Sequence, residues 1–150
     1  VLPNAVSDKD IDKIIALKSK YKLETGKTYN GNTTARKSEL IYFDPDYELW
    51  VFNILGSIGE WGNEVFKFDI DRVETAQYTE YDEAYNGTYD WHIDSFPIHT
   101  DPQRKISITV QLSDSKDYEG GDFILETHPT SEYDIRQKGT AIVFPSYLRQ

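Results

Sequence analysis

Residues 89–94 read YDWHID in a chain that has only three histidines. Taken as a β-strand, this stretch places His92 and Asp94 on one face and Trp91 and Ile93 on the other, because side chains alternate along a strand. We expect the apolar face to pack against a core and the polar face to line a cavity or meet solvent. An imidazole and a carboxylate on one face can bind the same metal ion, and Fe(II) suits that pair of donors. The spacing is a weak motif by itself, since it also occurs on solvated strands.

Short β-type segments separated by turn residues surround this pair. From residue 65 onward the sequence predicts strands over 65–70, 74–81, 89–94, 104–112, 122–127 and 140–144. The intervals between these segments suit loops and not crossover helices, which favours antiparallel pairing.

The N-terminal part predicts two helices. One spans residues 7–22, with Ser7 as its cap, and the other spans 46–62, while a strand over 38–43 lies between them. Two helices followed by antiparallel strands predict an α+β, mainly β, fold of the sandwich or barrel type, with the helices packed outside.

Composition limits the classes of function. A length of 150 residues suits a single domain over 1–150, and the net charge of −10 argues against nucleic acid and anionic membranes as partners. The chain has no cysteine, so neither a disulfide nor a cysteine ligand is available. The first residues show no basic segment followed by an apolar one, and no apolar stretch is long enough to span a bilayer. We therefore expect a cytoplasmic protein.

Three longer stretches carry a resemblance to a known family. They are QYTEYDEAYNGTYDWHIDSF (77–96), RKISITVQLSDSKDYEGGDFIL (104–125) and KGTAIVFPSYL (138–148). Their order and content resemble the prolyl-4-hydroxylase-like branch of the Fe(II)/2-oxoglutarate-dependent dioxygenases. The N-terminal helix and the strand that begins ARKSE are also similar to this branch, so that the resemblance covers nearly the whole chain.

The resemblance implies a fold, an activity and a set of site residues. The fold is a double-stranded β-helix, or jelly roll. The activity is hydroxylation of peptidyl proline in a peptide or protein substrate, with Fe(II), 2-oxoglutarate and O₂, and with ascorbate as a possible further cofactor; succinate and CO₂ are released. His92 and Asp94 correspond to iron ligands at the catalytic centre, and Tyr81 and Gln111 to contacts of the co-substrate 2-oxoglutarate.

The stretch FPSYLRQ (144–150) departs from the family pattern. Gln150 stands where the family has its second iron histidine, and the basic anchor of 2-oxoglutarate lies beyond that point in the family. Two explanations stay open: the domain lacks its C-terminal strand here, or Gln150 replaces the histidine as a weaker, neutral oxygen donor. The alternative functions are a catalytically inactive jelly-roll module that binds peptides with an incomplete metal site, and a purely structural role.

The remaining histidines and two loops have competing interpretations. His99 and His128 are further candidate ligands, but surface positions or ordinary hydrogen bonding are the favoured interpretation for both. The loops 24–35 and 95–103 border the substrate groove in the family that the chain resembles, and plain connectors are the alternative.

Overall fold

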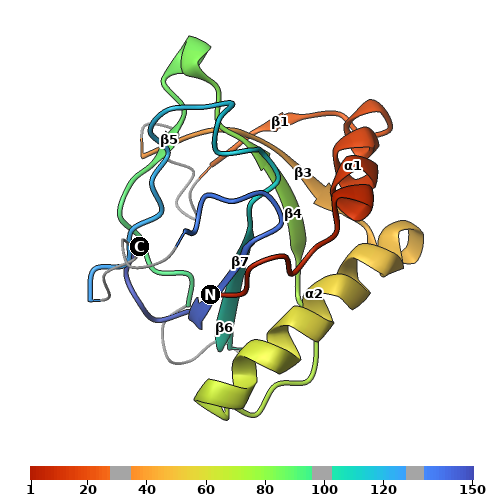
Figure 1. Cartoon of the computed structure of the whole chain (residues 1–150), viewed down its shortest axis with the longest axis vertical. Helices are drawn as coiled ribbons and strands as arrows, with labels where there is room; N and C mark the ends of the chain where they lie inside the picture. The colour runs from red at the N-terminus through yellow and green to blue at the C-terminus, as the bar shows by residue number, and fades with distance from the viewer. Residues whose placement is uncertain (28–34, 96–102, 128–133) are drawn as a thin grey trace.

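The computed structural model describes residues 1–27, 35–95, 103–127 and 134–150, and in these ranges short strands and two longer helices alternate (Figure 1). The predicted ligands His99 and His128, and most of the loops 24–35 and 95–103, lie outside the described residues. In chain order the elements are α1 (Asp8–Ala16), the 3-10 turn η1 (Leu17–Ser19), β1 (Glu24–Thr25), β2 (Arg36–Lys37), β3 (Glu39–Phe43), α2 (Pro45–Phe66), β4 (Ala76–Glu80), the 3-10 turn η2 (Glu83–Tyr85), β5 (Thr88–Tyr89), β6 (Ile106–Val110) and β7 (Ala141–Pro145).

The first helix begins where the sequence predicts but ends earlier. Ser7 caps α1, since its Oγ accepts a hydrogen bond from the backbone N–H of Asp10 at 3.2 Å. Ile11 and Ile14 face the core. The α-helix ends at Ala16 and continues only as the 3-10 turn η1, so that the predicted range 7–22 is too long.

The second helix is longer than predicted. Asp44 caps α2 by accepting from the N–H of Asp46 at 2.9 Å, and Pro45 occupies the first turn, where its missing N–H costs nothing. The helix ends at Lys67, which has left-handed backbone angles, and the side chain of Asn63 bonds both the N–H and the carbonyl of Phe68. Residues 65 and 66 therefore belong to α2, and the predicted strand over 65–70 is wrong. Of the helices in the described ranges, none has the length and apolar content needed to cross a bilayer.

The strands form small antiparallel sheets. In one of them β3 lies between β1 and β4, with a register that runs from Glu39 opposite Glu80 to Phe43 opposite Ala76. A second sheet pairs β2 with β5, and a third pairs β6 with β7. The predicted strands 38–43, 74–81 and 104–112 are confirmed with shorter bounds, and the strand 140–144 is confirmed with a shift of one residue, to Ala141–Pro145. The predicted strands 89–94 and 122–127 are wrong as regular strands, because only Thr88–Tyr89 of the first and an isolated bridge at residue 125 of the second are formed.

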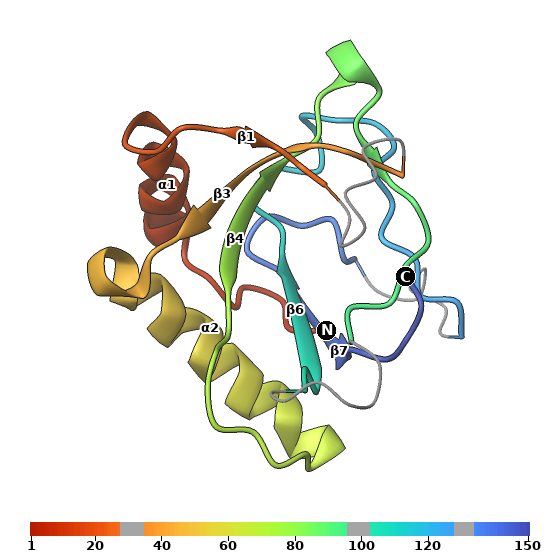
Figure 2. The same ribbon diagram turned by 180° about the vertical axis from the view of Figure 1, so that it is seen from behind.

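The two faces of β7 pack against different clusters. Ala141 and Val143 face the main core, which α1, α2, β3 and β4 also line, whereas Ile142 and Phe144 pack with Ile135. Figure 2 shows α1 beside β1 and β3, and α2 running along the side of β4 and β6. The face of the β6–β7 sheet that carries the second cluster also carries Ser107, which is paired with Phe144.

The N-terminal residues are tied to the last strand. Leu2 and Ala141 exchange two backbone hydrogen bonds of 2.8 and 2.9 Å, and the N–H of Val6 donates to the carbonyl of Gly139. The label N in Figure 1 accordingly lies beside β7.

Candidate metal centre

The segment that contains His92 and Asp94 runs alongside the residues that follow β7. His92 and Gln150 each donate a backbone N–H to the carbonyl of the other, at 2.9 and 3.0 Å. The N–H groups of Asp94 and Ser95 both donate to the carbonyl of Ser146, at 3.1 and 3.0 Å. These bonds fix the backbone of the predicted ligand pair against residues 146–150.

The predicted alternation of side chains holds at residues 91–94, but the expected packing of Trp91 and Ile93 against a core is wrong. Trp91 and Ile93 are 44% and 51% exposed, while the side chains of His92 and Asp94 are only 22% and 26% exposed. Trp91 does not pack in the core; its ring instead contacts the guanidinium of Arg149, 5.3 Å away. The physical reason is that Ser107 and Gln150 lie on the side of Asp94 and His92 and offer these two polar side chains hydrogen-bond partners.

The period of two breaks before residue 91. A strand over 89–94 would place Tyr89 and His92 on opposite faces, yet their rings stack with centroids 3.6 Å apart. The backbone bends at Trp91, which brings the two side chains to the same side.

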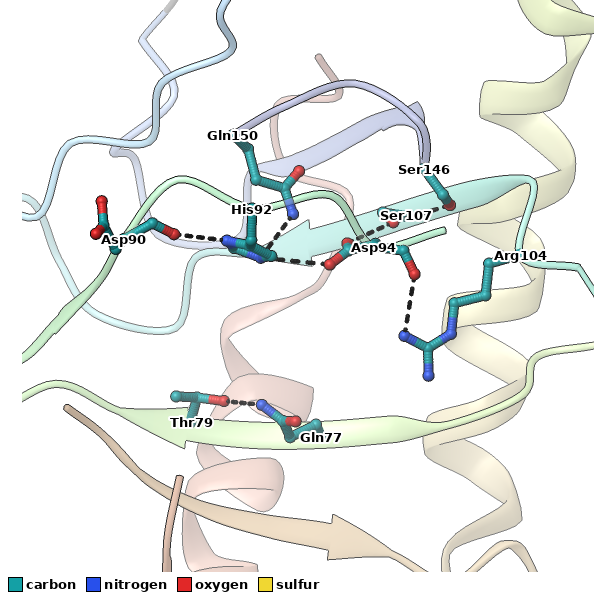
Figure 3. A network of polar contacts seen from close by, with 9 residues as sticks. All are labelled: Gln77, Thr79, Asp90, His92, Asp94, Arg104, Ser107, Ser146 and Gln150. Carbon is teal, nitrogen blue, oxygen red and sulfur yellow. Dashed lines mark hydrogen bonds and ion pairs between the residues drawn. The ribbon is translucent and has the colours of Figure 1, made fainter. Parts of the chain in front are cut away.

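The imidazole of His92 is held in one tautomer. Its Nδ1 lies 2.9 Å from the carbonyl oxygen of Asp90, and because a carbonyl only accepts, Nδ1 carries the hydrogen. In the neutral ring, Nε2 then presents a lone pair. Nε2 lies 3.3 Å from Asp94 Oδ1 and 3.1 Å from the side-chain nitrogen of Gln150, as Figure 3 shows. A backbone carbonyl on the far ring nitrogen is the usual support of a metal-binding histidine.

The carboxylate of Asp94 is fixed through its other oxygen. Ser107 Oγ donates to Oδ2 at 2.6 Å, and Ser146 Oγ lies 3.0 Å from Ser107 Oγ (Figure 3). Burial by itself would raise the pKa of Asp94, but the neighbouring imidazole of His92 and hydrogen bonds from Ser107 and Gln150 outweigh it and lower that pKa to about 2. Asp94 is therefore an anion at neutral pH, with Oδ1 directed to His92.

Tyr81 directly follows the facing strand β4 and continues a row of polar residues on it. Gln77 and Thr79, linked by a 2.6 Å hydrogen bond, lie across from His92 and Asp94 in Figure 3, and Tyr81 follows two residues later. Burial raises the pKa of Tyr81, and the charges of Arg36 and Asp94 both act on its phenol. The structure thus brings Tyr81 into the electrostatic neighbourhood of the ligand pair.

Gln111 lies at the opposite end of β6 from Ser107. It lies just beyond β6, where its backbone bonds Thr140 and Gly139 at 2.9 and 2.8 Å. It is four residues from Ser107, which corresponds to about 13 Å along an extended strand.

Several residues that shape the site were not predicted from the sequence. Arg36 is only 6% exposed; its Nε donates to Ser38 Oγ at 2.9 Å, and its guanidinium lies 4.6 Å from the centroid of the Tyr89 ring. Arg104 binds Glu74 at 2.6 Å and reaches the carbonyl of Asp94 at 3.5 Å. The sequence carried one usable signal, namely that Ser107 shares a polar face with Thr109 on a predicted strand.

The donors that are present fit a divalent metal in part. An unprotonated imidazole nitrogen and an ionised carboxylate oxygen lie 3.3 Å apart. Neighbouring ligands about 2.1 Å from one ion, at right angles, lie about 3.0 Å apart, so that this spacing suits a shared ion. Within the described ranges, however, no group of three or more His, Cys, Asp or Glu side chains lies close enough together to hold a metal.

Comparison with protein families agrees with this donor chemistry. The family model described as the 2OG-Fe(II) oxygenase superfamily matches residues 76–150, which is half of the 150-residue chain. The matched range contains β4, the His92–Asp94 pair, β6 and β7. The chain belongs to the 2OG-Fe(II) oxygenase superfamily, a class of oxidoreductases that uses Fe(II), 2-oxoglutarate and O₂. A search of curated proteins gave no match.

Proposed function

We propose that this protein is an Fe(II)- and 2-oxoglutarate-dependent hydroxylase in which His92 and Asp94 hold the iron. The observation that carries the proposal is the meeting of His92 Nε2 and Asp94 Oδ1 at 3.3 Å, each on a side chain whose other polar atom is already bonded. Such mutual support leaves one lone pair of each residue directed at the same point, as a metal requires.

The residues of the chain would divide the work as follows. Asp90 holds the imidazole of His92 through its carbonyl, and Ser107 holds Asp94. Tyr81 would donate its hydroxyl to a carboxylate of 2-oxoglutarate, and Gln111 would contact the same co-substrate. Iron with 2-oxoglutarate and O₂ supplies the oxidising power, because decarboxylation of 2-oxoglutarate to succinate and CO₂ is coupled to insertion of oxygen into a substrate C–H bond.

We further propose that the protein belongs to the prolyl-4-hydroxylase-like branch, with a jelly-roll core and peptidyl proline as its substrate. The motif order over 77–148 supports this assignment, and so do the antiparallel sheets. The tyrosine Tyr42 also supports it, since 54% of this residue is exposed. Proline-rich segments dock on aromatic side chains in extended form.

The test is succinate formation from 2-oxoglutarate under Fe(II) and O₂, with a proline-containing peptide and its proline-to-alanine counterpart. We expect succinate from the wild type and none from His92→Ala or Asp94→Ala. The surface variant Asp69→Asn is the matched carboxylate control. A peptide that gains one oxygen atom only when it contains proline would support the substrate assignment, and equal turnover of both peptides would refute it.

One observation favours a second candidate. Because the described residues supply only one histidine and one carboxylate to the centre, a module that binds peptides without catalysis is the alternative. Metal-dependent peptide binding without succinate formation would identify that module.

A further inference from the structure

We propose that the side-chain amide oxygen of Gln150 is the third protein ligand of this metal centre, so that the site is a His–Asp–Gln triad. This inference rests on the proposed function, because it assumes that His92 and Asp94 hold a metal. It assigns to Gln150 the position that a second histidine occupies in the family.

The backbone places Gln150 directly opposite His92. Each of these two residues donates its N–H to the carbonyl of the other, at 2.9 and 3.0 Å, across a sequence separation of 58 residues. Paired residues of this kind have their side chains on the same side of an antiparallel ladder. The amide of Gln150 is therefore held beside the imidazole by two backbone bonds.

The amide itself has an unused acceptor. Gln150 Nε2 lies 3.1 Å from His92 Nε2, while Oε1 is buried and has no hydrogen-bond partner among the described residues. A buried carbonyl oxygen without a partner costs about 1–3 kcal/mol, so such an atom calls for an explanation. If the nitrogen and oxygen of the amide exchange places, Oε1 faces His92 Nε2, and a metal ion bound there would provide the missing partner.

The hydrogen bond from Gln150 marks the place of a cation. Because Nδ1 of His92 carries the ring hydrogen, the N–H of Gln150 points at the lone pair of His92 Nε2. A metal uses that same lone pair. Rotation about the last side-chain bond of Gln150 exchanges its amide nitrogen and oxygen, and the oxygen, unlike the nitrogen, can bind a cation.

The spacings of His92 from the two other donor groups agree with one shared ion. His92 Nε2 lies 3.3 Å from Asp94 Oδ1 and 3.1 Å from the Gln150 amide. Ligands on one face of an octahedron lie about 3.0 Å apart when each is about 2.1 Å from the ion. The amide is neutral, as an imidazole is, so the triad would keep the charge balance of a two-histidine site.

An oxygen donor in place of an imidazole changes which metals are preferred. Imidazole suits Fe, Ni, Cu and Zn, whereas carbonyl and carboxylate oxygens suit Mn and Mg. The His–Asp–Gln site should therefore bind Mn(II) comparatively well and Co(II) comparatively weakly. Replacement of Gln150 by histidine should shift this preference toward Co(II).

The experiment measures the dissociation constants of Co(II) and Mn(II) for the metal-free protein, by titration and by the visible absorption spectrum of Co(II). The variants are Gln150→Leu, Gln150→His and His92→Ala, with the exposed Gln137→Leu as the matched control. We expect Gln150→Leu to weaken both metals at least about tenfold, since changes to residues that only support ligands already cost about 10–100-fold. Gln150→His should tighten Co(II) more than Mn(II), with a changed Co(II) spectrum.

The outcomes separate the two proposals. The triad is refuted if Gln150→Leu binds both metals like Gln137→Leu and Gln150→His leaves the Co(II) spectrum unchanged. In that case, loss of metal binding in His92→Ala would still support the proposed function. If the wild type and His92→Ala both fail to bind, the proposed function is refuted as well. Melting curves recorded without metal identify a variant that does not fold. If Gln150→Leu does not fold, Gln150→Glu replaces it, because glutamate keeps the shape of the side chain. Gln150→Glu should bind Mn(II) more tightly than the wild type.

Discussion

The phenol ring of Tyr89 lies almost parallel to the imidazole of His92, with 16° between the ring planes and 3.6 Å between the centroids. The same phenol contacts the guanidinium of Arg36, and Arg36 and Tyr89 are directly paired in the β2–β5 sheet. Tyr89 thus links a buried cation from the N-terminal half of the chain to the candidate metal ligand. The orientation of His92 depends on this contact as well as on the carbonyl of Asp90.

The first prediction concerns this stacking. Tyr89→Ala should weaken Co(II) binding several-fold, because an aromatic pair contributes about 0.5–1.5 kcal/mol and the imidazole then loses its support. Tyr89→Phe keeps the ring and should bind Co(II) like the wild type. If both variants lose the same affinity, the hydroxyl and not the stacked ring is what matters.

The second prediction concerns the serine that holds Asp94. Ser107→Ala removes a hydrogen bond of 2.6 Å to a carboxylate, and such bonds contribute about 1.5–3 kcal/mol. Because Asp94 is partly solvated, we expect a loss near the lower end of that range in the free energy of unfolding, measured with urea at pH 7. Thr109→Val on the same face of β6 is the control. Equal losses of unfolding free energy in the two variants would mean that the hydrogen bond from Ser107 to Asp94 makes no specific contribution to stability.

The third prediction concerns acid stability. Glu48 is only 3% exposed and accepts hydrogen bonds from Lys20, Tyr21 and Trp50 at 2.6, 2.9 and 2.9 Å. The bond from Lys20 is the largest influence and, with those from Trp50 and Tyr21, lowers the pKa of Glu48 below its ordinary value of 4.5 in spite of burial. The folded state therefore binds this proton less readily than the unfolded state.

The sign of the pH effect follows directly. The stabilisation by Glu48 is fully present above pH 4.5 and is lost as the pH falls through the lowered pKa of the folded state. Glu48→Gln should lower the melting temperature by a few degrees at pH 7, and the difference from the wild type should shrink below pH 4.5. The exposed Glu60→Gln is the control, and a difference that stays constant with pH would contradict the assignment.

The fourth prediction compares two glycines of α2. A Cβ at Gly62 would lie 2.5 Å from Val143 Cγ1, whereas a Cβ at Gly59 would meet Ile108 Cδ1 at an ordinary 3.4 Å. Alanine is favoured over glycine in helices by about 1 kcal/mol, so Gly59→Ala should be neutral or stabilising. Gly62→Ala should destabilise by about 1–3 kcal/mol through overpacking against β7. Urea unfolding of both variants provides the comparison, and equal stabilities would rule out close packing of α2 on β7.

Local sequence patterns predicted the elements that have strong local causes. Ser7 was predicted as the cap of the first helix and does cap it, because capping needs only neighbouring residues, whereas the Asp44–Pro45 pair that begins the second helix was not named in the prediction. The alternating segments over 104–112 and 140–144 became β6 and β7, since each has a paired neighbour in the fold.

The incorrect strands show what alternation leaves out. In the segment 122–127, Phe123 and Leu125 do pack against a core cluster while Ile124 is exposed, but the described residues provide no ladder for this segment. Alternation reports which side chains are buried, and pairing depends on a partner elsewhere in the chain. At residues 65–70 an apolar pattern that suits a strand was instead the last turn of α2 and its cap.

The sequence predicted the pair of candidate ligands but not the hydrogen bonds that hold them. His92 and Asp94 stand out by residue type and spacing. The contacts of Asp94 with Ser107 and of His92 with Gln150 depend on the register of β6 against β7 and on the course of residues 146–150. Register is fixed by tertiary packing, so sequence spacing alone could not supply these contacts.

The bridge between Leu2 and Ala141 has a consequence for how the chain is made. A ribosome delivers residue 2 long before residue 141, so the N-terminal segment has no place to dock until nearly all of the described chain has been synthesised. Contacts over such long separations are also slow to form, because closing a large loop costs entropy before the contact repays it. The helix α1 can form locally during synthesis, but the residues that precede it must wait for β7, and folding of the described chain therefore ends with the pairing of Leu2 and Ala141.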